Sequence, residues 1–170
     1  AVEALSGAGV LRESVEWGLS RVEWPGRLEV VSDEPLVLLD GARNAQAAAA
    51  LRETLLELCP GRRIHLLVGL SSDKSPERLG ELLGDLVVSA TCTKSRHPRA
   101  FDRLELARRL APFCPDVHVM SDPADAYTYL LNAASASDAI VVTGSLFLVG
   151  ELRRALRQAH VRPRRSSVEA

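Results

Sequence analysis

The sequence contains few cysteines and no pattern that would organise them into a site. Three of its 170 residues are cysteines, Cys59, Cys92 and Cys114, and they are widely spaced. No Cys-x-x-Cys pair and no cluster of histidines completes a zinc site. No neighbouring arrangement that would activate a thiol is visible either. We therefore expect reduced, mostly buried thiols with a structural role.

Long apolar runs and an excess of charge of one sign are also missing. No run approaches the roughly 20 apolar residues of a membrane span, and the first residues lack the basic and apolar regions of a signal peptide. The formal net charge is -1. A charge this small gives no long-range field that would attract nucleic acid or an anionic membrane. We expect a cytoplasmic protein with neither of these partners.

Both common phosphate-binding fingerprints are absent. The sequence contains no Gly-x-x-x-x-Gly-Lys-Ser/Thr loop and no Gly-x-Gly-x-x-Gly. The length, with 46% hydrophobic and 25% charged residues, fits one globular domain with its own core. Such a domain has no recognisable means of holding a nucleoside triphosphate by itself. If its function uses one, a partner domain is implied.

The sequence does contain a regular alternation of two patterns, short β-rich apolar runs and longer segments with helical spacing. The predicted strands are 28–31, 36–39, 64–70, 86–92, 117–120 and 139–142. The predicted helices are 44–58, a helix capped by Ser75 and opened by Pro76, and then 102–110, 122–134 and 145–159. The alternation of strand and helix predicts an α/β sheet.

Several predicted strands are apolar at consecutive positions, which is expected when helices cover both faces of a sheet. Val37-Leu38-Leu39 and Ile140-Val141-Val142 are examples. Right-handed crossovers then give a Rossmann-like, three-layer αβα fold with a mostly parallel sheet of about six strands. Only four residues join the first two strands, so these strands can pair as a hairpin. We therefore expect a mixed sheet with one antiparallel edge strand.

The same sequence patterns divide the chain into three regions. Residues 1–22 are expected to form a leading helix or interdomain connection, residues 23–160 the domain, and residues 161–170 a flexible tail. Trp17 and Trp24 are expected to pack the leading segment onto the domain.

Polar residues concentrate where ligands bind in such a sheet, beyond the carboxyl ends of the parallel strands. The segments concerned are 40–44, 71–74, 93–99 and 143–145. Each also has a plainer explanation, because Asn44 and Ser145 can simply cap the helices that follow and loop charges are usually solvated. Backbone amides at a helix start, as at Ser145, nevertheless form a ready anion site.

Three blocks of sequence carry a family resemblance. They are Trp24-Pro25-Gly26-Arg27-Leu28-Glu29-Val30, Leu39-Asp40-Gly41-Ala42-Arg43-Asn44 and Val142-Thr143-Gly144-Ser145-Leu146-Phe147-Leu148-Val149-Gly150-Glu151. In order and spacing they resemble the last domain of the folylpolyglutamate and dihydrofolate synthases, which belong to the Mur ligase superfamily. The resemblance covers nearly the whole chain, and the block around Thr143-Gly144-Ser145 is its most specific part.

This resemblance implies the carboxy-terminal domain of an ATP-dependent amide ligase that adds L-glutamate to dihydropteroate or to folate polyglutamate tails. ATP would phosphorylate a carboxylate, and the amine of glutamate would attack the acyl phosphate. The phosphate loop and the Mg²⁺ ligands would belong to an amino-terminal ATPase domain of the same polypeptide, so no metal is expected in this one. The domain alone is expected to be inactive.

The resemblance also implies roles for particular residues. The implied ATP-binding residues are Asp40, Arg27 and Asn44, and the implied glutamate-binding residues are Ser145 and Arg43. Asp40 would accept hydrogen bonds from the ribose hydroxyls, Arg27 would lie against the nucleotide, and Asn44 would order the loop. The second-tier candidates are Asp73, Lys74 and Arg99.

The sequence departs from the family pattern at one of these positions. The usual Asp-Gly-Ala-His-Asn-Pro reads Asp40-Gly41-Ala42-Arg43-Asn44-Ala45, so arginine replaces histidine. Arginine keeps a permanent positive charge and a planar fork that matches carboxylate or phosphate, but it does not titrate near neutral pH. Loss of the proline relaxes the helix entry without preventing it.

Two other classes of function stay open. The chain can belong to another Mur-type ligase, such as one that makes peptidoglycan or cyanophycin, although the Trp-Pro-Gly-Arg and Thr-Gly-Ser-Leu-Phe blocks argue against this. It can also be a non-catalytic binding or interaction module, which the missing phosphate loop and Arg43 support.

Overall fold

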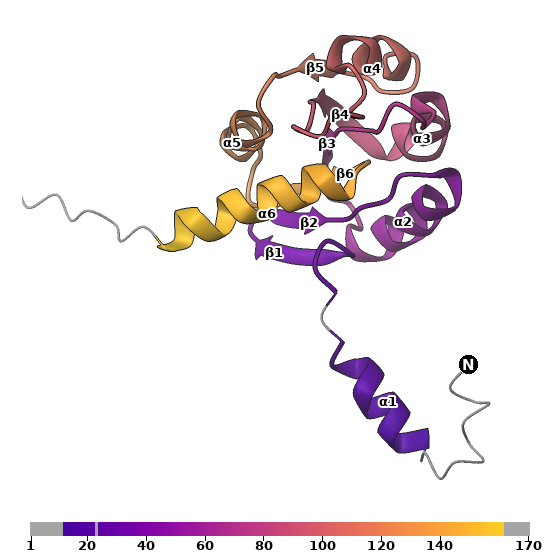
Figure 1. Ribbon diagram of the computed structural model, residues 1–170, viewed down its shortest axis with the longest axis vertical. Coiled ribbons are helices and arrows are strands. Elements are labelled where there is room, and N and C mark those ends of the chain that lie inside the picture. Colours follow the sequence, from indigo (N-terminus) through magenta and orange to yellow (C-terminus); the bar gives the residue numbers. More distant parts are fainter. Residues whose placement is uncertain (1–11, 23, 162–170) are drawn as a thin grey trace, which may run out of the picture.

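One six-stranded sheet forms the centre of the protein, in the strand order β1-β2-β6-β3-β4-β5 (Figure 1). The structure is a computed structural model that describes residues 12–22 and 24–161. The strands are β1 (Glu29–Asp33), β2 (Leu36–Leu39), β3 (Ile64–Val68), β4 (Val87–Cys92), β5 (Val117–Val119) and β6 (Ala139–Thr143). Neighbouring strands are parallel except β1 and β2, which pair antiparallel. The predicted mixed sheet with one antiparallel edge is confirmed.

Helices cover both faces of this sheet and complete the three layers. They are α2 (Ala45–Leu58), α3 (Pro76–Leu83), the 3₁₀ turn η2 (Gly84–Leu86), α4 (Arg103–Leu110), α5 (Pro123–Ala133) and α6 (Leu146–Val161). Buried residues of α2, α3 and α4 share one core cluster with the sheet. Those of α5 and α6 share the other. The predicted Rossmann-like αβα fold is therefore confirmed.

The central strands explain why the sequence shows consecutive apolar residues. Every residue of β3 and β6 is buried. Because side chains alternate across a strand, Leu66 and Val68 enter the first core whereas Leu67 enters the second. A strand covered on both faces needs apolar side chains on both.

The helices begin where the sequence predicts, at residues whose side chains accept hydrogen bonds from the first turn. Asn44 accepts from the amide of Ala47 at 2.8 Å. Ser75 caps α3, and Pro76 occupies its first turn. Such caps satisfy amides that have no partner within the helix.

The leading helix α1 (Arg12–Ser20) stands apart from the sheet (Figure 1) and buries none of its residues. Trp17 is 61% exposed and Trp24 is 71% exposed. The expectation that these tryptophans pack the leading segment onto the domain is therefore wrong. Trp17 instead carries the guanidinium of Arg21 over its ring, at 4.1 Å from the centroid. Residues 1–11 of the leading region and 162–170 of the predicted tail lie outside the described residues.

The three cysteines are free and buried, as expected. Burial raises the pKa of the Cys92 thiol to about 12, so this thiol is protonated and unreactive at neutral pH. Among the described residues, no three His, Cys, Asp or Glu side chains gather in a way that could hold a metal ion. No helix in the described part of the chain is both long and apolar enough to cross a membrane.

A buried polar group lies at the end of the sheet where the parallel strand β6 begins. Asp138 is 3% exposed and accepts from the amide of Ser135 at 2.9 Å. Its carboxylate lies 3.5 Å from Nε2 of His65, whose Nδ1 is 2.8 Å from the hydroxyl of Ser89. Burial raises the pKa of Asp138, but hydrogen bonding to Ser135, the nearby ring of His65 and the charge of Arg63 outweigh it, so the pKa is lowered overall.

This lowered pKa predicts how acid destabilises the fold. The ionised Asp138 contributes stability above its unfolded-state pKa of about 3.9, and this contribution is lost as the pH falls through the lower folded-state value. Asp138→Asn cannot titrate. Urea denaturation between about pH 5 and pH 2 should therefore show a shallower fall in the free energy of unfolding for Asp138→Asn than for the parent. Glu77, with a pKa of about 2, also titrates in this range, but it contributes equally to both proteins and cancels from the comparison. Parallel curves would therefore contradict this account.

Candidate functional site

The carboxyl ends of the central strands meet at an edge so crowded that it requires glycine. Gly144, which follows β6, has a φ of 98°, and a Cβ there would lie 2.6 Å from the carbonyl oxygen of Gly69. At Gly41, which follows β2, a Cβ would lie 2.3 Å from a methyl carbon of Leu146. Both distances are too short for real contacts. The glycines therefore allow segments from three strands to approach one another.

Asp40 joins the segment after β2 to the turn before β1. It is 8% exposed, and its carboxylate accepts from the amide of Ala42 at 2.8 Å and from the amide of Leu28 at 3.0 Å. The second bond holds Leu28 at a φ of 48°, which a leucine rarely adopts. A carboxylate has about four lone-pair positions, so Asp40 keeps acceptor capacity beyond these two bonds.

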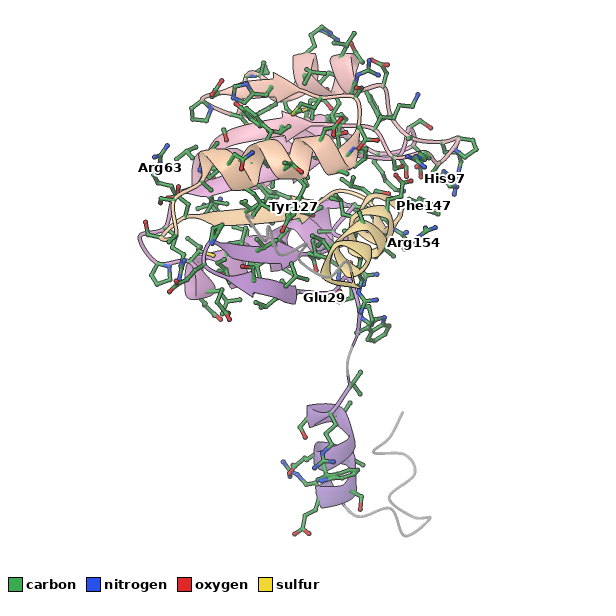
Figure 2. The ribbon with its side chains drawn as sticks, turned by 90° about the vertical axis from the view of Figure 1, so that its left-hand side faces the viewer. Glu29, Arg63, His97, Tyr127, Phe147 and Arg154 are labelled. Carbon is green, nitrogen blue, oxygen red and sulfur yellow. The ribbon has the colours of Figure 1, made fainter. Side chains whose placement is uncertain are left out.

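The turn that carries Arg27 is fixed beside Asp40. The amide of Gly41 donates to the carbonyl of Gly26 at 2.9 Å, and the guanidinium of Arg27 lies 3.6 Å from the position of a Cβ on Gly41. Glu29 supports the turn, since it accepts from the amide of Gly26 at 2.7 Å and pairs with Arg153 of α6 at 2.8 Å. Figure 2 labels Glu29 beside the helix that carries Arg154.

Ser145 lies on the same edge, at the start of α6. Its hydroxyl oxygen accepts from the amide of Phe147 at 3.1 Å, and the residue is 3% exposed. The carbonyl of Ala42 accepts from the amide of Gly144 at 2.9 Å, which links the segment after β2 to the start of α6. The structure thus brings Asp40 and Ser145, with the turn that carries Arg27, to one edge of the sheet.

A small cavity of about 160 Å³ lies between the amino-terminal ends of α2 and α3. Its lining includes Arg43, Asn44, Asp73, Lys74 and Arg78. The ammonium of Lys74 pairs with Asp73 at 2.6 Å, and hydrogen bonding to Lys74 lowers the pKa of Asp73. The structure therefore groups four of the predicted site residues around one cavity and adds Arg78, which the sequence did not single out.

Arg99 belongs to the loop that follows β4. Its carbonyl accepts from the amide of Ser72 at 2.8 Å, so the loop is fixed to the segment that carries Asp73. The positive charge of Arg99 also contributes to the lowered pKa of Asp73. In the same loop, the ring of His97 stacks on Phe147 of α6 with centroids 3.7 Å apart (Figure 2).

Three of the described arginines at this edge form no direct ion pair. In the described part of the chain, the side chains of Arg27, Arg43 and Arg99 form neither a hydrogen bond nor an ion pair with another residue. Guanidinium groups bind carboxylates and phosphates in a two-pronged geometry. The edge is therefore suited to anionic ligands.

Fold and edge together define a class: a doubly wound α/β domain that carries arginines without ion pairs at the carboxyl ends of its parallel strands and whose sequence contains no phosphate loop. The comparison with family models identifies the class more closely. Residues 26–146 match the model of the Mur ligase, glutamate ligase domain. The chain belongs to this family, and the resemblance inferred from its motifs is confirmed.

Individual relatives agree with this assignment. The dihydrofolate synthase/folylpolyglutamate synthase of Bacillus subtilis is 29% identical over 154 residues, which are 88% of this chain and 34% of the relative. A Mycobacterium tuberculosis folylpolyglutamate synthase, solved with ADP and AMPPCP, superposes with a TM-score of 0.81 at 29% identity and covers 95% of this chain. A bifunctional folylpolyglutamate synthase/dihydrofolate synthase, solved with Mn, AMPPNP and L-glutamate bound, gives a TM-score of 0.77 at 29% identity over 87% of this chain.

These relatives are much longer than the matched region. The chain spans 34% of the Bacillus protein, and it covers 38% and 35% of the chains in the two solved structures.

The crowding at Gly144 predicts a large effect of one methyl group. Gly144→Ala combines a strained φ with a clash against a backbone oxygen, so it should lower the free energy of unfolding by roughly 2–4 kcal/mol. Gly150→Ala, further along α6, is the matched control because nothing lies within 4 Å of its added Cβ. It should be neutral or stabilise by up to about 1 kcal/mol. Equal urea midpoints for the two variants would refute the close approach.

Proposed function

We propose that this chain is the carboxy-terminal part of an ATP-dependent ligase that adds L-glutamate to dihydropteroate or to folate polyglutamate tails. The observation that carries this proposal is the meeting of Asp40 with the Arg27 turn and Ser145 at one crowded edge. In such a reaction, ATP transfers its terminal phosphoryl group to a carboxylate of the acid substrate. The amine of glutamate then attacks the acyl carbon, and phosphate leaves as the amide forms.

On the nucleotide side, Asp40 and Arg27 have complementary tasks. The remaining lone pairs of the Asp40 carboxylate accept hydrogen bonds from the ribose hydroxyls, and its bonds to Leu28 and Ala42 fix the direction in which they point. The guanidinium of Arg27, which has no acidic partner, lies against the nucleotide. Asn44 keeps the adjoining loop in shape by capping α2.

On the glutamate side, the chain offers positive charge and a hydroxyl donor. The oxygen of Ser145 already accepts from the amide of Phe147, so its O–H proton remains available for a carboxylate of glutamate. The guanidinium of Arg43 forms two parallel hydrogen bonds with a carboxylate at the cavity between α2 and α3. The amino-terminal ends of these helices add to the positive potential there. Arg99 adds a positive charge beside it, whereas the charge of Lys74 is balanced by Asp73.

The remaining parts of such a site must come from elsewhere in the protein. The described residues contain no cluster that fits Mg²⁺, and the sequence has no phosphate loop. We therefore assign the ATP phosphates and Mg²⁺ to an amino-terminal ATPase domain of the same polypeptide. The exposed apolar side chains of α1 and Trp24 support residues 1–22 as the connection to it. The proposed location is the cytoplasm, where ATP and folates are available.

An assay of the parent protein, which carries the proposed ATPase domain, tests this function directly. We expect the parent to add glutamate to dihydropteroate or tetrahydrofolate in the presence of ATP. The 170-residue chain alone should be inactive, since it lacks a phosphate loop. A folded parent protein without activity on either acceptor would contradict the proposal and favour a different ligase or a binding module.

Substitutions on the glutamate side and on the nucleotide side of the edge should change the KM values of different substrates. Arg43→Ala should raise the KM for glutamate about 10- to 100-fold and leave the KM for ATP nearly unchanged, because a charge-assisted bond to a carboxylate is lost. Arg43→Lys should give an intermediate value, since it keeps the charge without the fork. Asp40→Asn should act mainly on the KM for ATP.

The control for these substitutions is Arg63→Ala, because Arg63 is exposed and lies at the opposite end of the sheet from His97 and Phe147 (Figure 2). It should leave both KM values unchanged. If Arg43→Ala and Arg63→Ala gave the same kinetics, the proposed role of Arg43 would be wrong.

A further inference from the structure

The loop after β4, residues 93–99, is attached to a helix that follows a different strand. The amide of Arg96 donates to Oε1 of Glu151 at 2.8 Å, a contact between residues 55 positions apart. One residue later, the ring of His97 lies on Phe147 with an interplanar angle of 14°. Phe147 and Glu151 are four residues apart in α6 and therefore lie on the same face of the helix. Together they form one surface that receives the loop.

The far end of the loop is attached to the segment after β3. The carbonyl of Arg99 accepts from the amide of Ser72 at 2.8 Å, and Ser71 and Ala100 form an antiparallel bridge. Within the loop, Nδ1 of His97 accepts from the amide of Arg99 at 3.2 Å. The loop thus spans the edge from the start of α6 to the cavity that Asp73 and Lys74 line.

The ion pair that Arg96 of this loop forms near α6 is weak. A surface cavity of about 390 Å³ lies there, lined by residues that include Arg96, Asp122, Glu151 and Arg154. The guanidinium of Arg96 is 3.9 Å from Asp122, and its side chain is 86% exposed, so this pair contributes little. The hydrogen bond to Glu151 and the stacked rings both attach the loop to α6.

We propose that Glu151 is a positioning residue for the ligand edge. Its carboxylate holds loop 93–99 on α6, and the loop in turn sets where Arg99 and His97 lie relative to Ser145 and to the cavity beside Lys74. Glu151 acts through the loop and does not contact the substrates. The kinetic consequence of this role rests on the proposed ligase function, whereas its structural consequence does not.

The structural consequence can be measured by NMR on the 170-residue chain. Glu151→Ala should accelerate hydrogen exchange of the Arg96 amide at least about tenfold, because the amide loses its acceptor. It should also reduce the upfield ring-current shift that Phe147 imposes on the His97 ring protons. Glu151→Gln keeps an Oε1 acceptor and should preserve both signals. Unchanged Arg96 exchange in Glu151→Ala would overturn the proposal.

Arg154→Ala is the matched control for this experiment. Arg154 lines the same cavity, but its side chain forms no hydrogen bond in the described part of the chain. Its replacement should leave the Arg96 amide and the His97 ring unchanged. Equal loss of protection in Arg154→Ala and Glu151→Ala would show general loosening of the cavity and would also overturn the proposal.

The functional consequence is tested in the parent protein. Glu151→Ala should raise the KM for glutamate about tenfold without lowering the thermal unfolding midpoint by more than a few degrees, and Glu151→Gln should restore the parent value. Faster Arg96 exchange with an unchanged KM would refute the positioning role. An inactive unsubstituted parent would refute the proposed function and, with it, the kinetic role of Glu151. The exchange data would still decide whether Glu151 holds the loop.

Discussion

The edge at the carboxyl ends of the parallel strands depends on the close approach of backbone segments that follow β2, β3 and β6. A Cβ at Gly144 would collide with the carbonyl of Gly69, and a Cβ at Gly41 would collide with Leu146. Since Gly144 has no side chain to meet the backbone of Gly69, the segments can exchange hydrogen bonds across the ends of the sheet. The carbonyl of Ala42 accepts from the amide of Gly144 for this reason. Asp40 and Ser145 lie buried within this crowded backbone, at 8% and 3% exposure.

Residues of helix α6 hold the segments that carry the side chains of this edge. Its start carries Ser145, and its first two turns hold segments from distant parts of the sequence. Arg153 pairs with Glu29 and so supports the turn that presents Arg27, while Glu151 and Phe147 hold the loop that carries Arg99. A domain without its own phosphate loop can contribute to catalysis in this way, because positioning and charge stabilisation require fixed groups rather than a complete site.

The sequence predicted much of this structure because much of it has a local signal. Consecutive apolar residues such as Val37-Leu38-Leu39 indicate a strand buried on both faces, and Asn44 and Ser75 are side chains that cap helices. The contacts of Glu29 and Glu151 could not be predicted, since they join residues 124 and 55 positions apart and leave no periodic pattern. Trp17 and Trp24 misled the prediction because an aromatic residue indicates burial without indicating which surface covers it.

The most direct test of the central claim is a crystal structure of the parent protein with a non-hydrolysable ATP analogue and L-glutamate. The claim is that the edge formed by Asp40, Arg27 and Ser145 is one wall of a ligand site that another domain completes. It predicts ribose hydroxyls within hydrogen-bond distance of Asp40, with Arg27 against the nucleotide and a glutamate carboxylate near Ser145 and Arg43. A nucleotide and a glutamate bound without any contact to this edge would contradict the claim.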